Sequence, residues 1–175
     1  MRKIIAFLLA TLMLLSLAAC GGTQTPGTTD DSGKTPGNDS ASTQTEAGFA
    51  LTFSDVKLVP GAAFDAKALP EADTVTQVPS CAFQGTDNAY NYGTFELTAY
   101  NEGKGEIIYS IYLLDPNTAT DEGLYLGDDL ARAKELYGTE FTQNGTQVTY
   151  TRGKTLLNLI LQDDSIISIE LRMAQ

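Results

Sequence analysis

The stretch that decides the fold is "TFELTAYNEGKGEIIYSIYLL", residues 94–114. Apolar and polar residues alternate on both sides of a central segment that holds two glycines and two charged residues. Alternation is typical of antiparallel strands with one wet face, and the central composition is typical of a hairpin loop. We therefore predict strands over residues 94–100 and 106–114, joined by a loop at residues 101–105.

Similar patterns on either side predict more strands and two short helices. The further strands are expected at residues 49–53, 56–58, 89–92, 147–151, 155–161 and 166–173. One short helix is predicted over residues 62–69, between Gly61 and Pro70. A clearer helix follows Asp128 or Asp129, which can cap its free amides, and Gly138 ends it.

Two segments of the chain resemble each other. The sequence "IYSIYL" at residues 108–113 aligns with "IISIEL" at residues 166–171, and each lies in the last strand of a three-strand run. A helix-like segment precedes each run. The pattern predicts an α+β fold made of tandem helix-plus-antiparallel-meander repeats, at roughly residues 56–115 and 120–175. Chance similarity between two amphipathic strands is the alternative, because six aligned positions are few.

The frame "GDDLARAKELYG" at residues 127–138 resembles that of the β-lactamase-inhibitor-protein-like repeat fold, which small lipoproteins of outer-membrane assembly share. More closely, "PSCAFQGTDNAYNYGTFELTAY" (79–100) and "TDEGLYLGD" (120–128) resemble uncharacterised lipoproteins of clostridia and their relatives. The resemblance implies an exported lipoprotein with this repeat fold. It implies no functional residues, and shared fold alone does not carry an activity.

The first twenty residues have the layout of an export signal. Arg2 and Lys3 precede an apolar run at residues 4–17, which is too short for a membrane span. The run ends in Leu17-Ala18-Ala19-Cys20, which resembles the lipobox of bacterial lipoproteins. The resemblance implies a signal peptide at residues 1–19 and an acylated Cys20 that anchors the chain in membrane lipid. A plain signal peptide with a chance cysteine is the alternative.

Residues 20–48 are expected to form a disordered, lipidated linker. Residues 21–48 contain six Gly, seven Thr, three Ser and two Pro, with no aromatic residue and no Val, Ile or Leu. Such a segment cannot bury enough apolar surface to offset the entropy of ordering it. The remaining residues, 49–175, are long enough for a single domain with one core. We expect this domain at the extracytoplasmic face of the cell membrane, and the linker composition favours a Gram-positive host.

The predicted domain is strongly acidic. Residues 49–175 contain 8 basic and 18 acidic side chains, which gives a net charge of −10. This charge argues against nucleic acid as a partner. Solubility of an exported domain explains it most simply, and a cationic partner is the alternative.

The chain offers no catalytic constellation, so we expect no enzyme activity, cofactor or metal. It contains no histidine, which excludes Ser-His-Asp and Cys-His nucleophiles and histidine metal sites. The segment that starts at Asp115 begins like an EF-hand loop but has Ala119, Thr120 and Leu126 where calcium ligands or glycine are needed. Cys81, the only cysteine besides Cys20, is expected to be buried; pairing between molecules or redox sensing is the alternative.

Tyrosine is the residue type left to account for, and five of the eight tyrosines fall within residues 90–112. Strict alternation predicts a core face formed by Ile107, Tyr109, Ile111 and Leu113. The opposite face is then a candidate interaction face, formed by Glu96, Thr98, Tyr100, Ile108 and Tyr112. A helix or strand that covers it is the alternative.

We therefore expect a lipid-anchored, non-catalytic binding or interaction domain that uses its sheet face to hold an envelope protein or a small ligand, whose identity the sequence does not give. A small-molecule-sensing or enzyme-accessory lipoprotein, with a pocket between the repeats, is the second hypothesis, and a hydrolase the third.

Overall fold

The computed structural model describes residues 48–101 and 103–175, all of which belong to one compact unit. The predicted signal peptide, Cys20 and the linker up to residue 47 lie outside the described residues. The predictions of lipidation and disorder are therefore untested by the structure.

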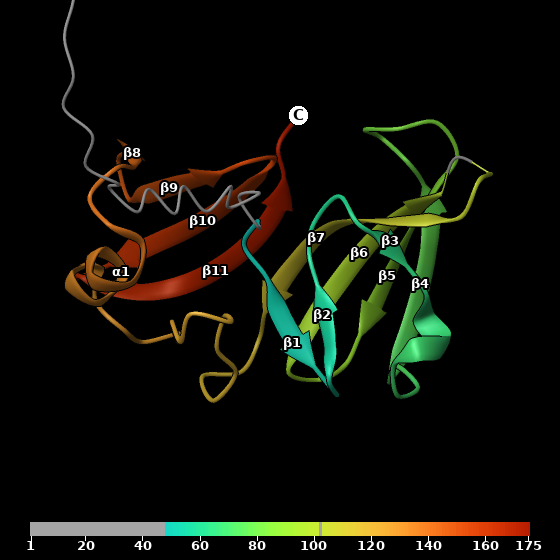
Figure 1. Ribbon diagram of the computed structural model, residues 1–175, viewed down its shortest axis with the longest axis horizontal. Helices are drawn as coiled ribbons and strands as arrows, with labels where there is room; N and C mark the ends of the chain where they lie inside the picture. The colour runs from blue at the N-terminus through green and yellow to red at the C-terminus, as the bar shows by residue number, and fades with distance from the viewer. Residues whose placement is uncertain (1–47, 102) are drawn as a thin grey trace, which may run out of the picture. The chain divides into compact units, whose positions relative to one another are not determined.

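The described residues form a small hairpin, a large antiparallel sheet and one α-helix (Figure 1). The hairpin pairs β1 (Leu51–Phe53) with β2 (Val56–Leu58), and the helix is α1 (Leu130–Tyr137). The strands of the large sheet are β3 (Ala63–Phe64), β4 (Thr74–Pro79), β5 (Thr86–Asn91), β6 (Phe95–Asn101), β7 (Glu106–Leu113), β8 (Thr142–Asn144), β9 (Gln147–Arg152), β10 (Thr155–Gln162) and β11 (Ser165–Met173).

The large sheet consists of two antiparallel meanders that meet at β7 and β11. Its strand order is β4-β5-β6-β7-β11-β10-β9-β8. The short strand β3 pairs with the first residues of β7, and β11 pairs with later residues of the same strand. At the junction, Ser110, Ile111 and Tyr112 of β7 lie opposite Arg172, Leu171 and Glu170 of β11. The two segments that align in the sequence are therefore antiparallel neighbours in the sheet.

The prediction of an α+β fold of helix-plus-meander repeats, like that of the β-lactamase inhibitor protein, is wrong. The described chain is mostly antiparallel β, arranged as an open, sandwich-like sheet. Residues 62–69 do not form the expected helix: they contain β3 and a 3-10 turn, η1 (Ala66–Ala68), where Asp65 accepts a hydrogen bond from the Lys67 amide. Three residues cannot supply the packed helix that the repeat requires.

The helix at the centre of the second half is confirmed. The Asp129 side chain accepts a hydrogen bond of 2.7 Å from the Arg132 amide, which caps the first turn of α1. Gly138 ends the helix with a positive φ of 85°, a conformation that disfavours side chains with a Cβ. Ala133 is completely buried against the sheet.

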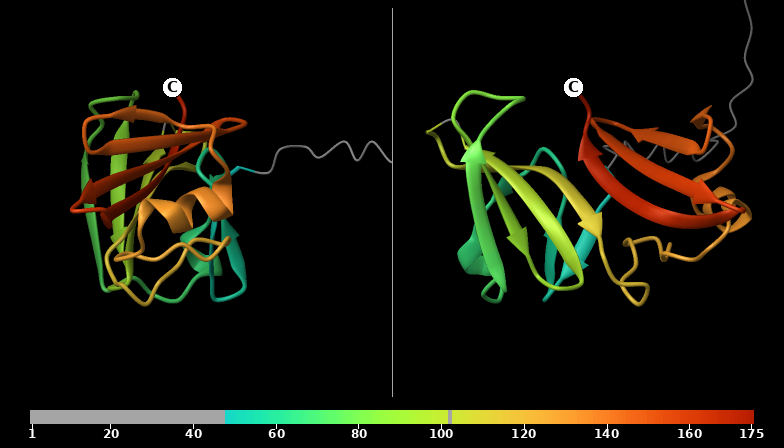
Figure 2. Two further views of the ribbon diagram at one scale, coloured as in Figure 1. Left: turned by 90° about the vertical axis from the view of Figure 1, so that its left-hand side faces the viewer. Right: turned by 180° about the vertical axis from the view of Figure 1, so that it is seen from behind.

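One face of the large sheet carries the core, and the other face we call the open face. Side chains from the hairpin, from α1 and from the loop between β7 and α1 join the strand residues in one apolar cluster. The buried residues include Phe49, Leu51, Leu58, Phe95, Leu97, Ile108, Ile111, Leu113, Leu124, Ala133, Val148, Tyr150, Leu157, Leu159, Ile166, Ile169 and Leu171. Figure 2, right, shows the strands from behind, with the hairpin and α1 on the far side.

Candidate functional site

A row of polar side chains crosses the open face from one meander to the other. The strand register places Glu96 opposite Tyr112, Tyr112 opposite Glu170, and Glu170 opposite Asn158. The Thr149 hydroxyl donates a hydrogen bond of 2.9 Å to Asn158, whose amide donates one of 2.9 Å to Glu170. These bonds fix the Glu170 carboxylate beside Tyr112 at the junction of the two meanders.

Tyr112 is the exposed aromatic residue of this row. Its side chain is 39% exposed, and directly paired strand residues have Cβ atoms about 5 Å apart, so both neighbouring carboxylates can reach a group bound on the ring. A ring flanked by two carboxylates suits a cationic group, because charge attraction and the cation–π interaction act together. Arg172 lies opposite Ser110 in the next row and places a basic side chain near the junction.

An aromatic cluster lies at the other end of the candidate face. Phe83, from the loop between β4 and β5, stacks on Tyr100 with ring centroids 3.9 Å apart and meets Tyr109 edge-on at 5.4 Å. The Ser80 hydroxyl accepts a hydrogen bond of 2.9 Å from the Phe83 amide and so holds this loop in place. The loop partly covers Tyr100, whereas Tyr112 stays open to solvent.

The structure corrects one member of the candidate interaction face. Ile108 is only 1% exposed and belongs to the core, while Tyr109, predicted in the core, contacts Phe83. A β-bulge causes the exchange: Ala99 lies opposite Ile108, but Thr98 lies opposite Ser110, so β7 has one extra residue. Glu96, Thr98, Tyr100 and Tyr112 do share a face, because each alternates with a buried residue.

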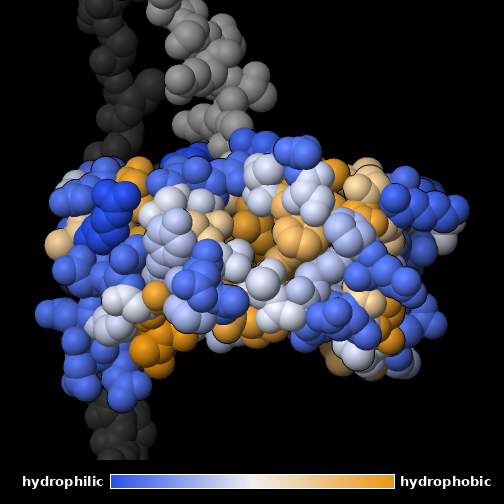
Figure 3. All heavy atoms as spheres, turned by 90° about the horizontal axis from the view of Figure 1, so that it is seen from below, coloured by the Kyte–Doolittle hydropathy of each residue, from blue (hydrophilic) through white to orange (hydrophobic). Residues whose placement is uncertain are grey.

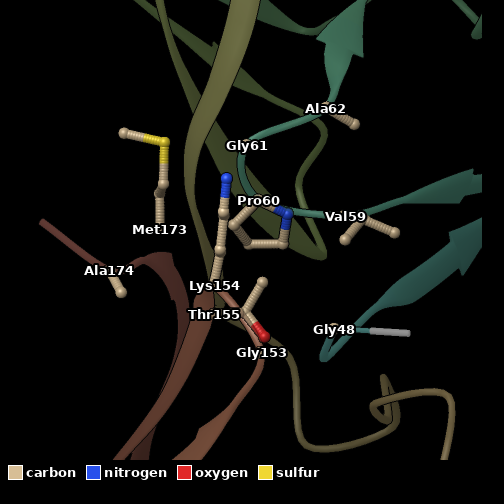
Figure 4. A pocket seen from close by; sticks show the side chains of 10 residues that line it. All are labelled: Gly48, Val59, Pro60, Gly61, Ala62, Gly153, Lys154, Thr155, Met173 and Ala174. Carbon is tan, nitrogen blue, oxygen red and sulfur yellow. The ribbon is translucent and has the colours of Figure 1, made fainter. Parts of the chain in front are cut away.

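A cavity of about 710 Å³ lies where the described chain begins. It is lined by Gly48, by residues 59–62, by the turn between β9 and β10, and by Met173 and Ala174. Figure 4 shows the Lys154 side chain extending between Met173 and Pro60. Its ammonium group forms no ion pair within the described residues, so the cavity combines apolar walls with one available cation.

A buried hydrogen-bond network joins β5 to the start of β7. The Tyr90 hydroxyl donates to the Glu106 carboxylate, at 2.9 and 2.8 Å from its two oxygens, and Asn88 donates to the same group. Burial, followed by the bond to Glu106 and the charge of that group, raises the pKa of Tyr90 to about 12. A tyrosine held protonated in this way is a poor base or nucleophile at neutral pH, so we interpret the network as structural.

A second network joins Phe49, near the first described residue, to the second meander. Arg152 pairs with Glu122, and its guanidinium lies 4.4 Å from the centre of the Phe49 ring. The Tyr137 and Thr120 hydroxyls lie 2.6 Å apart, and burial raises the pKa of Tyr137. This network too holds packed elements together rather than presenting a reactive group.

Other sequence predictions have mixed outcomes. Cys81 is exposed, so its predicted burial is wrong: it lies in the loop between β4 and β5, with no element packed over it. Asp115, which begins the EF-hand-like segment, accepts hydrogen bonds from the amide and side chain of Asn117, which closes a local turn. Among residues 48–101 and 103–175, no three Cys, Asp or Glu side chains gather in an arrangement that could hold a metal ion.

Within the part of the chain that the structure describes, no helix has the length and apolar character needed to cross a membrane. In comparisons with known proteins, no family model, curated protein or solved structure matches this chain. The resemblance to clostridial lipoproteins therefore stays a prediction from the sequence.

Proposed function

We propose that the chain is a lipid-anchored lipoprotein on the extracytoplasmic face of the cell membrane, whose domain binds a protein of the envelope without catalysis. The observation that carries the binding role is the exposed Tyr112 between Glu96 and Glu170 on the open face. The acidic domain and this arrangement together favour a basic segment of the partner. The proposal of a lipid anchor rests on the lipobox-like residues 17–20 and on the export-signal layout before them.

The hydropathy of the face seen in Figure 3 supports recognition through single aromatic anchors rather than through a large apolar patch. In the view of Figure 3, hydrophilic residues cover most of the surface and the hydrophobic residues form separate small patches. Such a surface does not drive association by apolar burial alone, so aromatic anchors in a polar surround must supply the contacts. Tyr112, an exposed aromatic residue between two carboxylates, is an anchor of this kind.

The binding role is tested by cross-linking in cells that express the full chain. We expect Tyr112→Ala to remove one or more cross-linked partners. Tyr125→Ala is the matched control, because Tyr125 is 41% exposed, much like Tyr112, but lies in the loop before α1. An unchanged partner set in Tyr112→Ala would exclude this face. Glu96→Gln with Glu170→Gln should weaken the same cross-links if the partner segment is basic.

The anchor has a separate test. Cells grown with labelled palmitate should yield a labelled chain that loses its label in Cys20→Ser. A mature chain that is unlabelled and released into the medium would contradict the anchor while leaving the binding role open.

The cavity near Lys154 supports a second candidate function, the sensing of a small molecule with an anionic group and an apolar body. A thermal-shift screen of carboxylates and phosphates, repeated on Lys154→Ala, distinguishes this from protein recognition. A shift of several degrees that disappears in the variant would favour the cavity.

A further inference from the structure

The two edge strands of the large sheet differ in how well they are protected from pairing with another strand. Among the described residues, β8 ends one side and has three residues, whereas β4 ends the other and has six. All six residues of β4 are exposed, and the strand "TVTQVP" carries no charge. Natural edge strands are usually shortened, bulged or charged, because a bare edge pairs with other strands. Only Pro79, at the last position, interrupts the edge of β4 (Figure 1).

The alternation of hydrogen bonds between β4 and β5 shows which backbone N–H and C=O groups of β4 point toward β5 and which point away from the sheet. The Ser80 amide donates to the carbonyl of Gly85, at 3.1 Å, and these residues lie opposite each other just beyond the strand ends. Because hydrogen-bonded pairs alternate along an antiparallel ladder, Thr74, Thr76 and Val78 direct their backbone groups toward β5. The N–H and C=O groups of Val75 and Gln77 therefore point away from the sheet.

We propose that β4 pairs antiparallel with β4 of a second copy of this chain, across a two-fold axis at Thr76. In this register Val75 of one copy lies opposite Gln77 of the other, and all four outward groups of each strand find partners. Thr76 then faces its own equivalent, and Thr74 faces Val78. The interface is isologous, so it closes as a dimer and leaves no further β4 edge.

The distribution of charge favours antiparallel over parallel pairing of the two β4 strands. The acidic residues near β4 precede it, at Glu71 and Asp73, while residues 79–85 after it are neutral. Antiparallel pairing places the acidic end of each strand beside the neutral end of the other. The net charge of −10 on each domain still opposes association, so the dimer should strengthen as salt screens this repulsion.

The first test is sedimentation equilibrium under reducing conditions. It uses residues 42–175, the compact unit that contains the complete core described above. We expect a monomer–dimer equilibrium that shifts toward the dimer at higher salt. Val75→Pro should abolish the dimer and keep the fold, because its lost N–H points away from β5 and proline is tolerated at such edge positions. Val75→Thr keeps the N–H and should still dimerise. A monomer under all conditions, or a dimer that survives Val75→Pro, would overturn the proposal.

The second test measures the register in a Cys81→Ser background. Thr76→Cys should form a disulfide-linked dimer on oxidation, because paired residues at a non-hydrogen-bonded position have Cα atoms about 4.5 Å apart. Thr74→Cys is the matched control: its equivalent in the second copy would lie about 13 Å away along the strand. Equal cross-linking of the two variants, or none in Thr76→Cys, would contradict pairing centred on Thr76. Neither test depends on the partner proposed for the open face.

Discussion

Replacing Tyr90 with phenylalanine should change how the stability of the domain depends on alkaline pH. The Tyr90 ring is 9% exposed and packs edge-on against Phe64, with centroids 5.0 Å apart, so Tyr90→Phe keeps the apolar contacts. It removes only the hydroxyl that donates to the Glu106 carboxylate. Glu106 keeps its hydrogen bond from Asn88, so the carboxylate does not lose every partner.

The magnitude follows from the pKa of about 12 in the folded domain, against the ordinary value of 10.0. Above pH 10 the unfolded chain releases this proton, while the folded domain retains it until about pH 12. The free energy of unfolding therefore falls as pH rises through this window, by about 1.4 kcal/mol per pH unit from this one group. The contribution is fully present below pH 10.

The assay is urea unfolding at pH 8 and at pH 11, followed by circular dichroism. At pH 8 we expect Tyr90→Phe to cost about 1.5–3 kcal/mol, the usual value of a hydrogen bond to a charged group. Between the two pH values the wild-type domain should lose about 1.4 kcal/mol more than the variant. Tyr125→Phe, which removes a hydroxyl from an exposed loop, is the control. If wild type and Tyr90→Phe lose equal stability between pH 8 and pH 11, the pKa of Tyr90 is not raised by its burial and its bond to Glu106.

Three further predictions concern an ion pair, a helix cap and a buried core side chain. For each, urea unfolding at neutral pH measures the change in the free energy of unfolding. Arg152→Met should cost about 2 kcal/mol because it leaves the partly buried Glu122 carboxylate without its cationic partner and with only the hydrogen bond from Tyr137. Combining it with Glu122→Gln should cost less than the sum of the two single changes. Asp129→Ala should cost about 1 kcal/mol through loss of the helix cap, with Asp129→Asn close to wild type. Leu97→Ala should cost about 2–5 kcal/mol because the side chain is completely buried, and a smaller loss would mean that the core can collapse around it.

The sequence predicted best those elements whose signals are local. The strands at residues 94–100 and 106–114 alternate and enclose a glycine-rich loop, and the structure confirms both as β6 and β7. The position of α1 followed from a capping aspartate and a terminal glycine, each of which acts within one turn. These features depend on interactions between residues close in the chain, so a single sequence contains the information.

The errors arise where long-range pairing overrides the local pattern. No residue type marks the bulge in β7, which depends on how this strand pairs with β6. Strict alternation therefore misplaced Ile107, Ile108 and Tyr109: Ile107 lies opposite Tyr100 and outside the core cluster. The strand β4 is absent from the predicted strands because both of its faces are exposed and its sequence shows no apolar alternation. Residues 62–69 have a helical composition, yet the pairing of β3 with β7 determines their conformation. The candidate face was therefore predicted in outline, with one residue on the wrong side.

Residues 49–53, at the start of the domain, help to hold the two meanders together. Among the described strands, the two meanders pair through β7 and β11, and residues 49–53 contact both meanders. The Phe49 amide donates to Thr155 at 2.9 Å and its ring meets Tyr137, while Phe53 packs on Phe95 with centroids 5.0 Å apart. Because these contacts lie on the core side of the sheet, binding at the open face or at β4 leaves them intact.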